Sequence, residues 1–447
     1  MKRLLRFILL VLILLAYDTL NAQQSLTLED AIAIALQNNH NIKIERLNVE
    51  QSTNLATAGN AGLLPTLGVS TGFTYNSNDL YLEIATFGEQ GISGSQAVSG
   101  NGVVTTQRQA GATLSYTLFG GFRGVNNFRI LKIQKNLTEV QLQQVMEQTI
   151  ASTASIFYEI ARLQEQLETS KTALAISKER LQRLENSKTF GAATTTQILQ
   201  AQVDVSSDSS TINQLALALT IYKAELNEFL GRKADYPLQL TDVSTTLPEL
   251  ETKEVLKDRL LVRNTTLQQT GLAIELAKKE TRISQSSFLP NISLDLGFQD
   301  YREENDLGQI LVLETTGFNA GITIRRDLFT GGQNRTRIQN NKIREKQSLY
   351  QHQVTELTVQ RQFETAYLTY QNSLSDLDFE KNNLKLFQQN LEKSRLDYTN
   401  GIITGTDFRT AQLNLVRAQN RVVNLEYDAK QSLIQIQQLT GELISKN

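Results

Sequence analysis

Few residues of this chain could act as catalysts or metal ligands. It has two histidines, His40 and His352, and no cysteine. His40 lies in an asparagine-rich break and His352 in a long helical pattern, positions where histidine is more often a surface or interface residue. The glycine pairs occur at strand-to-helix turns and lack the spacing of a phosphate loop. The sequence therefore predicts no enzyme, no cofactor and no metal site, and its formal net charge of −2 argues against nucleic acid as the main partner.

Residues 1–22 have the pattern of a secretory signal peptide. Lys2, Arg3 and Arg6 supply a basic start, residues 7–17 are apolar, and Ala22 ends an acceptable cleavage site. An uncleaved membrane anchor is the alternative, but spanning a bilayer takes about 20 apolar residues. The mature chain is therefore expected outside the cytoplasm. Without cysteine, we expect no disulfide and no N-terminal lipid.

The sequence is internally duplicated. Leu64-Pro65 and Leu289-Pro290 each precede an alternating strand pattern, 225 residues apart. Gly191 and Gly401, 210 residues apart, are each followed ten residues later by Ala-Gln. Repeats of this kind bury their apolar faces against copies of themselves. The pattern predicts a first structural repeat at 23–235 and a second at 236–447.

Each repeat is predicted to contain a β-hairpin followed by a long helical hairpin. The β-hairpins are expected at about 66–119 and 291–329, and the helical hairpins at about 122–231 and 332–441. The remaining predicted features are helices at 27–36, 42–63 and 265–288, polar loops at 76–109 and 300–316, and a joint between the repeats at 232–249.

The four strands alternate apolar residues with small or polar ones, as strands of outer-membrane barrels do. On the polar face, the residues expected to line a lumen are Asp295, Gln299, Asn319 and Arg325. Four strands cannot close a barrel alone and lipid does not tolerate an open edge, so two copies would give eight strands and three would give twelve. A soluble β-sandwich fragment remains an alternative, because soluble antiparallel sheets show the same alternation.

The helices predict a two-layered rod. In the first repeat the short helices at 42–63 and 194–230 together nearly equal the long one in length, so they can stack end to end beside it. Several rods side by side would form a helical cylinder that continues the barrel. A plain coiled-coil bundle without a lumen is the alternative that periodicity alone leaves open.

Together, the signal peptide, the Leu-Pro strand starts, the Leu-Phe-Thr-Gly-Gly turn at 328–332 and the duplicated Gly-x₉-Ala-Gln helix returns resemble the TolC-type outer-membrane efflux family. The resemblance covers nearly all of the mature chain. It implies an α+β membrane protein: a homotrimer whose 12-stranded outer-membrane β-barrel, four strands per chain, continues into a long periplasmic α-helical barrel.

In function, the resemblance implies the channel of a tripartite efflux or secretion system in the outer membrane of a Gram-negative bacterium. Its partners would be a periplasmic adaptor protein, an inner-membrane pump of the RND or ABC class, and outer-membrane lipid. A secreted or surface coiled-coil protein without a pore and a secreted hydrolase are the alternatives.

The resemblance also places a gate and a docking surface at the two helical turns. Asp407 lies at the position of a family gate acid, where three copies would repel anions and could bind a divalent ion. A helix-start carboxylate favoured by the helix dipole is the other interpretation. The residues at gate positions are Asp407, Tyr398, Gln197, Thr410 and Ile403, of which Gln197, Thr410 and Ile403 depart from the family pattern. The adaptor-docking tip would comprise Phe190, Gly191, Gly401, Leu199 and Phe408.

Overall fold

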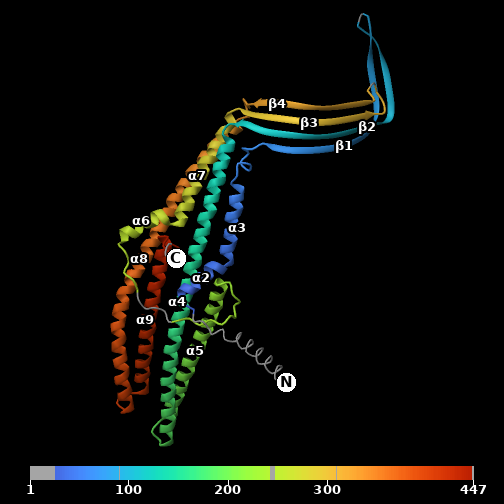
Figure 1. The fold of residues 1–447 in the computed structure, drawn as a ribbon. Helices are drawn as coiled ribbons and strands as arrows, with labels where there is room; N and C mark the ends of the chain where they lie inside the picture. The colour runs from blue at the N-terminus through green and yellow to red at the C-terminus, as the bar shows by residue number, and fades with distance from the viewer. Residues whose placement is uncertain (1–25, 90, 242–246, 309, 445–447) are drawn as a thin grey trace, which may run out of the picture. The chain divides into compact units, whose positions relative to one another are not determined.

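The computed structural model describes residues 26–89, 91–241, 247–308 and 310–444, so the predicted signal peptide at 1–22 lies outside the described residues. The chain divides into two compact units. We call Met1–Val49, Thr138–Gly271 and Gln351–Asn447 the helical unit, and Glu50–Leu137 and Leu272–Tyr350 the sheet unit. Along the chain (Figure 1), the elements are α2 (Leu28–Asn38), α3 (His40–Leu55), β1 (Thr66–Gly88), β2 (Gly91–Gly120), α4 (Arg123–Thr189), α5 (Thr195–Phe229), α6 (Lys253–Arg263), α7 (Thr265–Gln285), η1 (Ser286–Phe288), β3 (Asn291–Asn305), β4 (Val312–Arg325), α8 (Gln333–Thr399) and α9 (Gly405–Leu439).

Two apolar cores stabilise the helical unit, one from each half of the sequence. In the first, Phe157 and Ile160 of α4 pack against α2 and against Leu226 of α5. In the second, Phe363 of α8 packs with Leu260 of α6 and with α9. Helix α6 is thus the counterpart of α2 at the same 225-residue shift, and it was absent from the predicted elements because the segment after 249 was left unassigned.

One asparagine in each core connects the start of one helix to the end of another. The Asn39 side chain donates to the carbonyl oxygen of Phe229 at 3.2 Å, and the Asn264 side chain donates to that of Leu439 at 3.0 Å. Each asparagine also accepts from a backbone N–H of the following helix, so it caps that helix. The duplication therefore extends to individual hydrogen bonds.

Replacing Asn264 by alanine should lower the free energy of unfolding by about 1 to 3 kcal/mol, because the change leaves the buried carbonyl of Leu439 without its donor and removes a cap. Thermal denaturation measures the effect. Asn382→Ala on the exposed side of α8 is the matched control and should change the melting temperature little. Equal losses in the two variants would contradict the assigned role.

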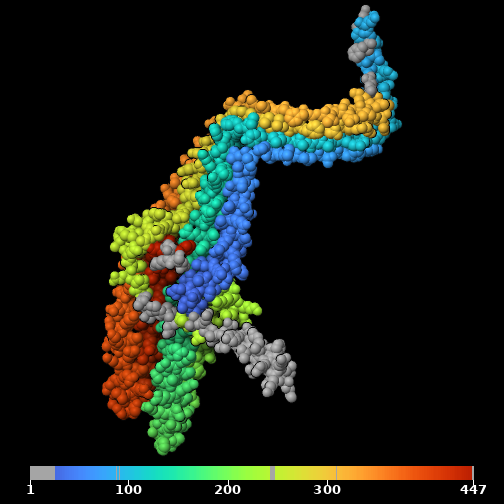
Figure 2. Space-filling view, viewed as in Figure 1, coloured from blue at the N-terminus to red at the C-terminus, as the bar shows by residue number. Residues whose placement is uncertain are grey.

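The sheet unit contains one antiparallel sheet in the order β1-β2-β3-β4. Figures 1 and 2 show the strands side by side with no helix over the visible face of the sheet. Side chains alternate as predicted: Leu114 pairs with Leu296 and Leu294 with Ile322 on an apolar face, while Ser115 pairs with Asp295 on a polar face. Register and alternation together place several glycines on the polar face, among them Gly68, Gly72, Gly111, Gly297, Gly317 and Gly321.

Several predicted boundaries were wrong. Residues 76–109 are paired strand rather than loop for most of their length, because β1 continues to Gly88 and β2 starts at Gly91. The loop expected at 300–316 shortens in the same way, since β3 reaches Asn305. Polar strand residues paired along both hairpins satisfy their backbone groups as well as apolar ones do.

Smaller differences occur at the element ends. Helix α3 ends at Leu55, before the predicted end at 63, and hydrogen-bonded turns fill the gap to Pro65. Strand β4 ends at Arg325, before the predicted 329. Leu118 falls in a bulge, after which Phe119 pairs with Ile292.

Candidate functional site

Two short turns carry most of the predicted site residues. One joins α4 to α5 through Gly191 (φ 75°) and the other joins α8 to α9 through Gly401 (φ 74°). Both glycines adopt the left-handed conformation that commonly ends a helix. After each turn a threonine caps the next helix in a capping box, Thr194 with Gln197 and Thr404 with Asp407. Gln197 and Asp407 are therefore structural equivalents, one neutral and one charged.

The Asp407 carboxylate is exposed at the start of α9. It accepts hydrogen bonds from the Thr404 backbone N–H at 3.0 Å and from the Thr404 hydroxyl at 2.6 Å. These two bonds hold the pKa of the Asp407 carboxyl below its ordinary value, the hydroxyl contributing most. The residue is thus a helix-start carboxylate, and its exposure leaves it available to ions.

Tyr398 belongs to the core of the second hairpin. Its ring stacks on that of Phe408 with 5.2 Å between centroids, and both pack with Ile403 and with Ile176 of α4. Phe408, expected on the docking surface, is only 4% exposed. Within the described chain the Tyr398 hydroxyl and the Gln197 side chain form no hydrogen bond with each other. The Gln197 side chain accepts hydrogen bonds from Thr194 instead.

The other predicted tip residues are exposed. Phe190 in the first turn is 87% exposed and Leu199 in the first turns of α5 is 57% exposed. Thr410 lies at the exposed surface of α9, where its hydroxyl donates to the Thr406 carbonyl. Ile402, beside Gly401, is exposed to a similar degree as Leu199.

Arginine–aspartate pairs, which the sequence analysis missed, join the two hairpins about one to four helical turns from the loops. Arg180 of α4 pairs with Asp204 of α5 and donates to the Gly405 carbonyl at 3.1 Å. Arg409 of α9 holds Asp208 of α5 through bonds of 2.6 and 3.0 Å. All four charged side chains are at most 13% exposed. We call these four residues the tether.

Neutral groups complete the tether. The Ser177 hydroxyl donates to Asp208 at 2.6 Å and accepts from Arg409 at 3.0 Å. Gln412, which is 1% exposed, donates to the Ala173 carbonyl at 2.7 Å. Because Arg409 and Gln412 lie on α9 while Ser177 and Ala173 lie on α4, these bonds connect the two repeats. A signal for the tether was the i, i+4 spacing of Asp204 and Asp208, which puts both carboxylates on one helix face.

More exposed bonds lie closer to the turns. Arg183 of α4 donates to the Thr399 hydroxyl at 3.0 Å, and Arg395 of α8 pairs with Glu179 at 3.2 Å. Exposed pairs of this kind contribute little, so the buried tether dominates the attachment.

The residues predicted for a lumen are spread along the polar face of the sheet. Asp295 of β3 accepts from the Ser115 hydroxyl of β2 at 2.7 Å. Gln299 lies opposite Gly317 and Asn319 opposite Gly297, while Arg325 at the end of β4 lies opposite Asn291. These side chains share a face without forming a compact cluster.

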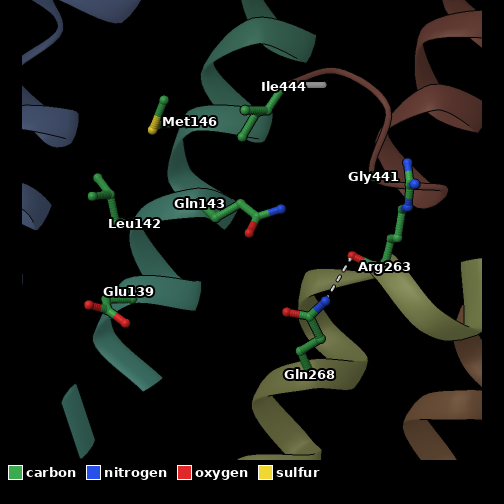
Figure 3. Close-up of a pocket in the computed structure, with 8 residues that line it drawn as sticks. All are labelled: Glu139, Leu142, Gln143, Met146, Arg263, Gln268, Gly441 and Ile444. Carbon is green, nitrogen blue, oxygen red and sulfur yellow. Dashed lines mark hydrogen bonds between the residues drawn. The ribbon is translucent and has the colours of Figure 1, made fainter. Parts of the chain in front are cut away.

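A groove of about 520 Å³ in the helical unit brings together residues of α4, the α6–α7 joint and the end of α9 (Figure 3). Glu139 and Gln143 lie on one side and Arg263 and Gln268 on the other, where the Gln268 side chain donates to the Arg263 carbonyl at 3.4 Å. The lining contains no histidine, serine or aspartate and therefore offers no nucleophile paired with a base.

The histidines are separate from every feature above. His40 opens α3 at the surface, and the His352 ring contacts the Thr270 hydroxyl at 2.7 Å. Among the described residues no group of three potential ligands could hold a metal ion. No described helix carries an apolar stretch sufficient to cross a bilayer.

The chain matches the family model of outer membrane efflux proteins over residues 31–232 and 256–442. It is 21% identical over 400 residues to the probable outer membrane lipoprotein SilC of Salmonella typhimurium, covering 89% of this chain and 81% of that protein. It is also 21% identical over 406 residues to the cation efflux system protein CusC of Escherichia coli strain K12, covering 89% and 82%.

Solved structures share the fold. A crystal structure of CusC superposes with a TM-score of 0.78 at 18% identity, covering 92% of this chain and 91% of that one. VceC from Vibrio cholerae gives a TM-score of 0.76 at 17% identity over 93% and 96% of the two chains. The predicted α+β fold, the outer-membrane location and the efflux-channel function are confirmed, and the pore-less coiled-coil alternative has no support. The chain belongs to the outer membrane efflux protein family.

Proposed function

We propose that three copies of this chain form the passive duct of a tripartite export system, with a periplasmic adaptor and an inner-membrane RND or ABC pump as partners. The open edges of the sheet carry this proposal. β1 and β4 each have one neighbour in the chain, and lipid does not tolerate their unpaired backbone groups. Joining β4 of one copy to β1 of the next closes twelve strands and removes every edge.

The two faces of the sheet then acquire separate roles. The apolar face, with Leu294 and Ile322, meets lipid, and the polar face, with Asp295, Gln299, Asn319 and Arg325, lines the bore. Heat-modifiable trimers that require detergent and conduct ions in planar bilayers would be the direct result. A freely water-soluble monomer after processing would contradict the proposal.

In the proposed duct, the helical turns at Gly191 and Gly401 form the entrance and the adaptor surface. Three Asp407 carboxylates around a threefold axis would favour cations and could bind a divalent ion. Phe190 and Leu199 offer exposed apolar side chains to an adaptor, as protein contact sites often do. Tyr398, Phe408 and Ile403 support this surface by packing beneath it.

Asp407→Gln is expected to lower the preference of the trimer for cations and its block by divalent ions. The capping box survives this change, because Gln197 caps Thr194 in the equivalent position. Reversal potentials in asymmetric salt across planar bilayers measure the preference. Gln197→Asp, which adds a carboxylate at the equivalent turn, should raise it.

The pH dependence of the wild-type trimer follows from the lowered pKa of Asp407. Because the Thr404 bonds favour the carboxylate, the charge persists below the ordinary aspartate pKa of about 4, and the cation preference should fade only at more acidic pH. Reversal potentials that are the same for wild type and Asp407→Gln at pH 7 would remove Asp407 from the entrance while leaving the channel assignment intact.

A further inference from the structure

Three arginines line one pocket of about 360 Å³ in the sheet unit, close to the strand-to-helix turns. Arg123 is the first residue of α4, three residues after β2 ends, and Arg337 and Arg344 lie one and three turns into α8. Ser284 and Ser287, from α7 and η1, line the same pocket. Guanidinium groups and serine hydroxyls are the donors that phosphate oxygens prefer.

These arginines have no anionic partner in the described chain. Arg337 donates to neutral groups, the Ser287 hydroxyl and the side-chain amide oxygen of Asn334 at 2.8 Å. Neither Arg123 nor Arg344 forms an ion pair with a described residue. Glu280, the one carboxylate on the lining, also forms no ion pair there. With three arginines and one carboxylate on its lining, the pocket keeps a net positive charge, which favours the binding of an anion.

The surroundings point to a membrane surface. Residues 123–137 carry four basic residues and no acidic one, and residues 333–350 carry five basic residues and one acidic one, in a chain whose formal net charge is −2. Basic segments beside a membrane attract anionic lipid. Phe122 and Phe288, each adjacent in sequence to a lining residue, are 60% and 48% exposed, as aromatic residues at a bilayer interface are.

We propose that this pocket binds the phosphate of a phospholipid headgroup at the helical end of the barrel. The location relies on the proposed duct, in which this end of the sheet meets the inner leaflet. The exposed aromatic side chains contact the adjoining acyl chains, and the three guanidiniums bind the phosphate. Such a site would fasten each subunit to the membrane at a fixed depth, in a chain that has no cysteine to carry a lipid.

Native mass spectrometry of detergent-solubilised trimers tests the proposal. Wild type should retain phosphatidylglycerol at least about tenfold more tightly than diacylglycerol with the same acyl chains, since the two lipids differ by the phosphate-bearing headgroup. Arg123→Gln with Arg344→Gln should weaken retention by about 30-fold, taking about fivefold for each arginine near an anionic headgroup. Arg129→Gln with Arg335→Gln removes the same charge from the same helices at positions outside the pocket lining. This variant should lose only the diffuse attraction, so its retention should fall clearly less than that of Arg123→Gln with Arg344→Gln.

Equal losses in the two double variants would show diffuse attraction and overturn the site, as would failure of the wild type to distinguish the two lipids. If inorganic phosphate binds the trimer while phosphatidylglycerol does not, the headgroup assignment is wrong. Arg344→Gln alone, expected to weaken retention about fivefold, decides the matter if the double variant does not assemble. Conductance of the same wild-type trimers tests the duct separately, so a failed lipid site and a failed channel are distinguishable.

Discussion

Replacing Arg409 by methionine is expected to loosen the attachment between the two helical hairpins and, in the proposed duct, to raise the conductance of the trimer in planar bilayers. The substitution leaves the Asp208 carboxylate, 12% exposed, without its bidentate partner, and a broken buried pair costs about 3 to 5 kcal/mol. The lost free energy weakens the attachment between the α8–α9 hairpin and the α4–α5 hairpin. A shift of this size changes an opening equilibrium by more than a hundredfold, at about 1.4 kcal/mol per factor of ten.

Arg395→Met provides the matched control for this prediction. Arg395 lies on α8 and loses an arginine–carboxylate pair with α4, to Glu179 at 3.2 Å, but the two side chains are 53% and 50% exposed. Exposed pairs are worth about 0 to 1 kcal/mol, so the conductance should stay near that of wild type. Asp208→Asn with Arg409→Met, which removes both charges, should recover part of the closed behaviour. An unchanged conductance in Arg409→Met would show that the tether does not limit opening.

The second large effect is expected on the apolar face of the sheet. Ile322→Arg places a charge on the apolar face of β4, opposite Leu294, where arginine in a lipid-facing position costs up to about 2 to 4 kcal/mol per chain, the upper range applying at the bilayer midplane. Since the trimer carries three copies, the yield of heat-resistant trimers should collapse. Semi-native gel electrophoresis and thermal dissociation of the trimer measure the effect.

Thr323→Arg, one residue further along β4, is the control. Thr323 lies opposite Ser293 on the polar face. An arginine at this position would therefore extend into the water-filled pore of the proposed barrel at little cost in free energy. Trimers of this variant should form normally and conduct differently. If Thr323→Arg destabilises the trimer as much as Ile322→Arg, the assignment of the two faces is wrong.

Much of the fold follows from local patterns in the sequence. Alternation identified the paired segment around Leu114 and Leu294, and helical spacing identified α4 and α8 to within a few residues of their ends. The predicted strands of the β1–β2 hairpin were too short because residues 76–79 and 93–102 are mostly polar or small, while their pairing depends on the partner strand rather than on hydrophobicity. Helix α6 was missed although the 225-residue shift that relates the strand starts also maps α2 onto it.

The site was less predictable because it depends on distant contacts. Asp407 and Gln197, which the resemblance places just after the two turns, each complete a capping box there, and capping is a local property that residues three apart determine. The tether joins residues separated by about 200 positions, and no spacing within the sequence relates Arg409 to Asp208. Its members would read as ordinary surface charges until α4, α5 and α9 are packed together. The roles of the predicted gate and docking residues stay predictions.

In the proposed barrel, the glycines on the polar face of the sheet affect the width of the pore. At Gly68, Gly317 and Gly321 an added methyl group would meet no other atom within 4 Å, whereas at Gly297 it would collide with the Asn319 side chain. At these three positions the polar face carries no side chain although there is space for one. Substituting those three positions with progressively larger residues would narrow the pore stepwise while the lipid-facing surface stays unchanged. The pore diameter can therefore be varied independently of the surface that contacts the membrane.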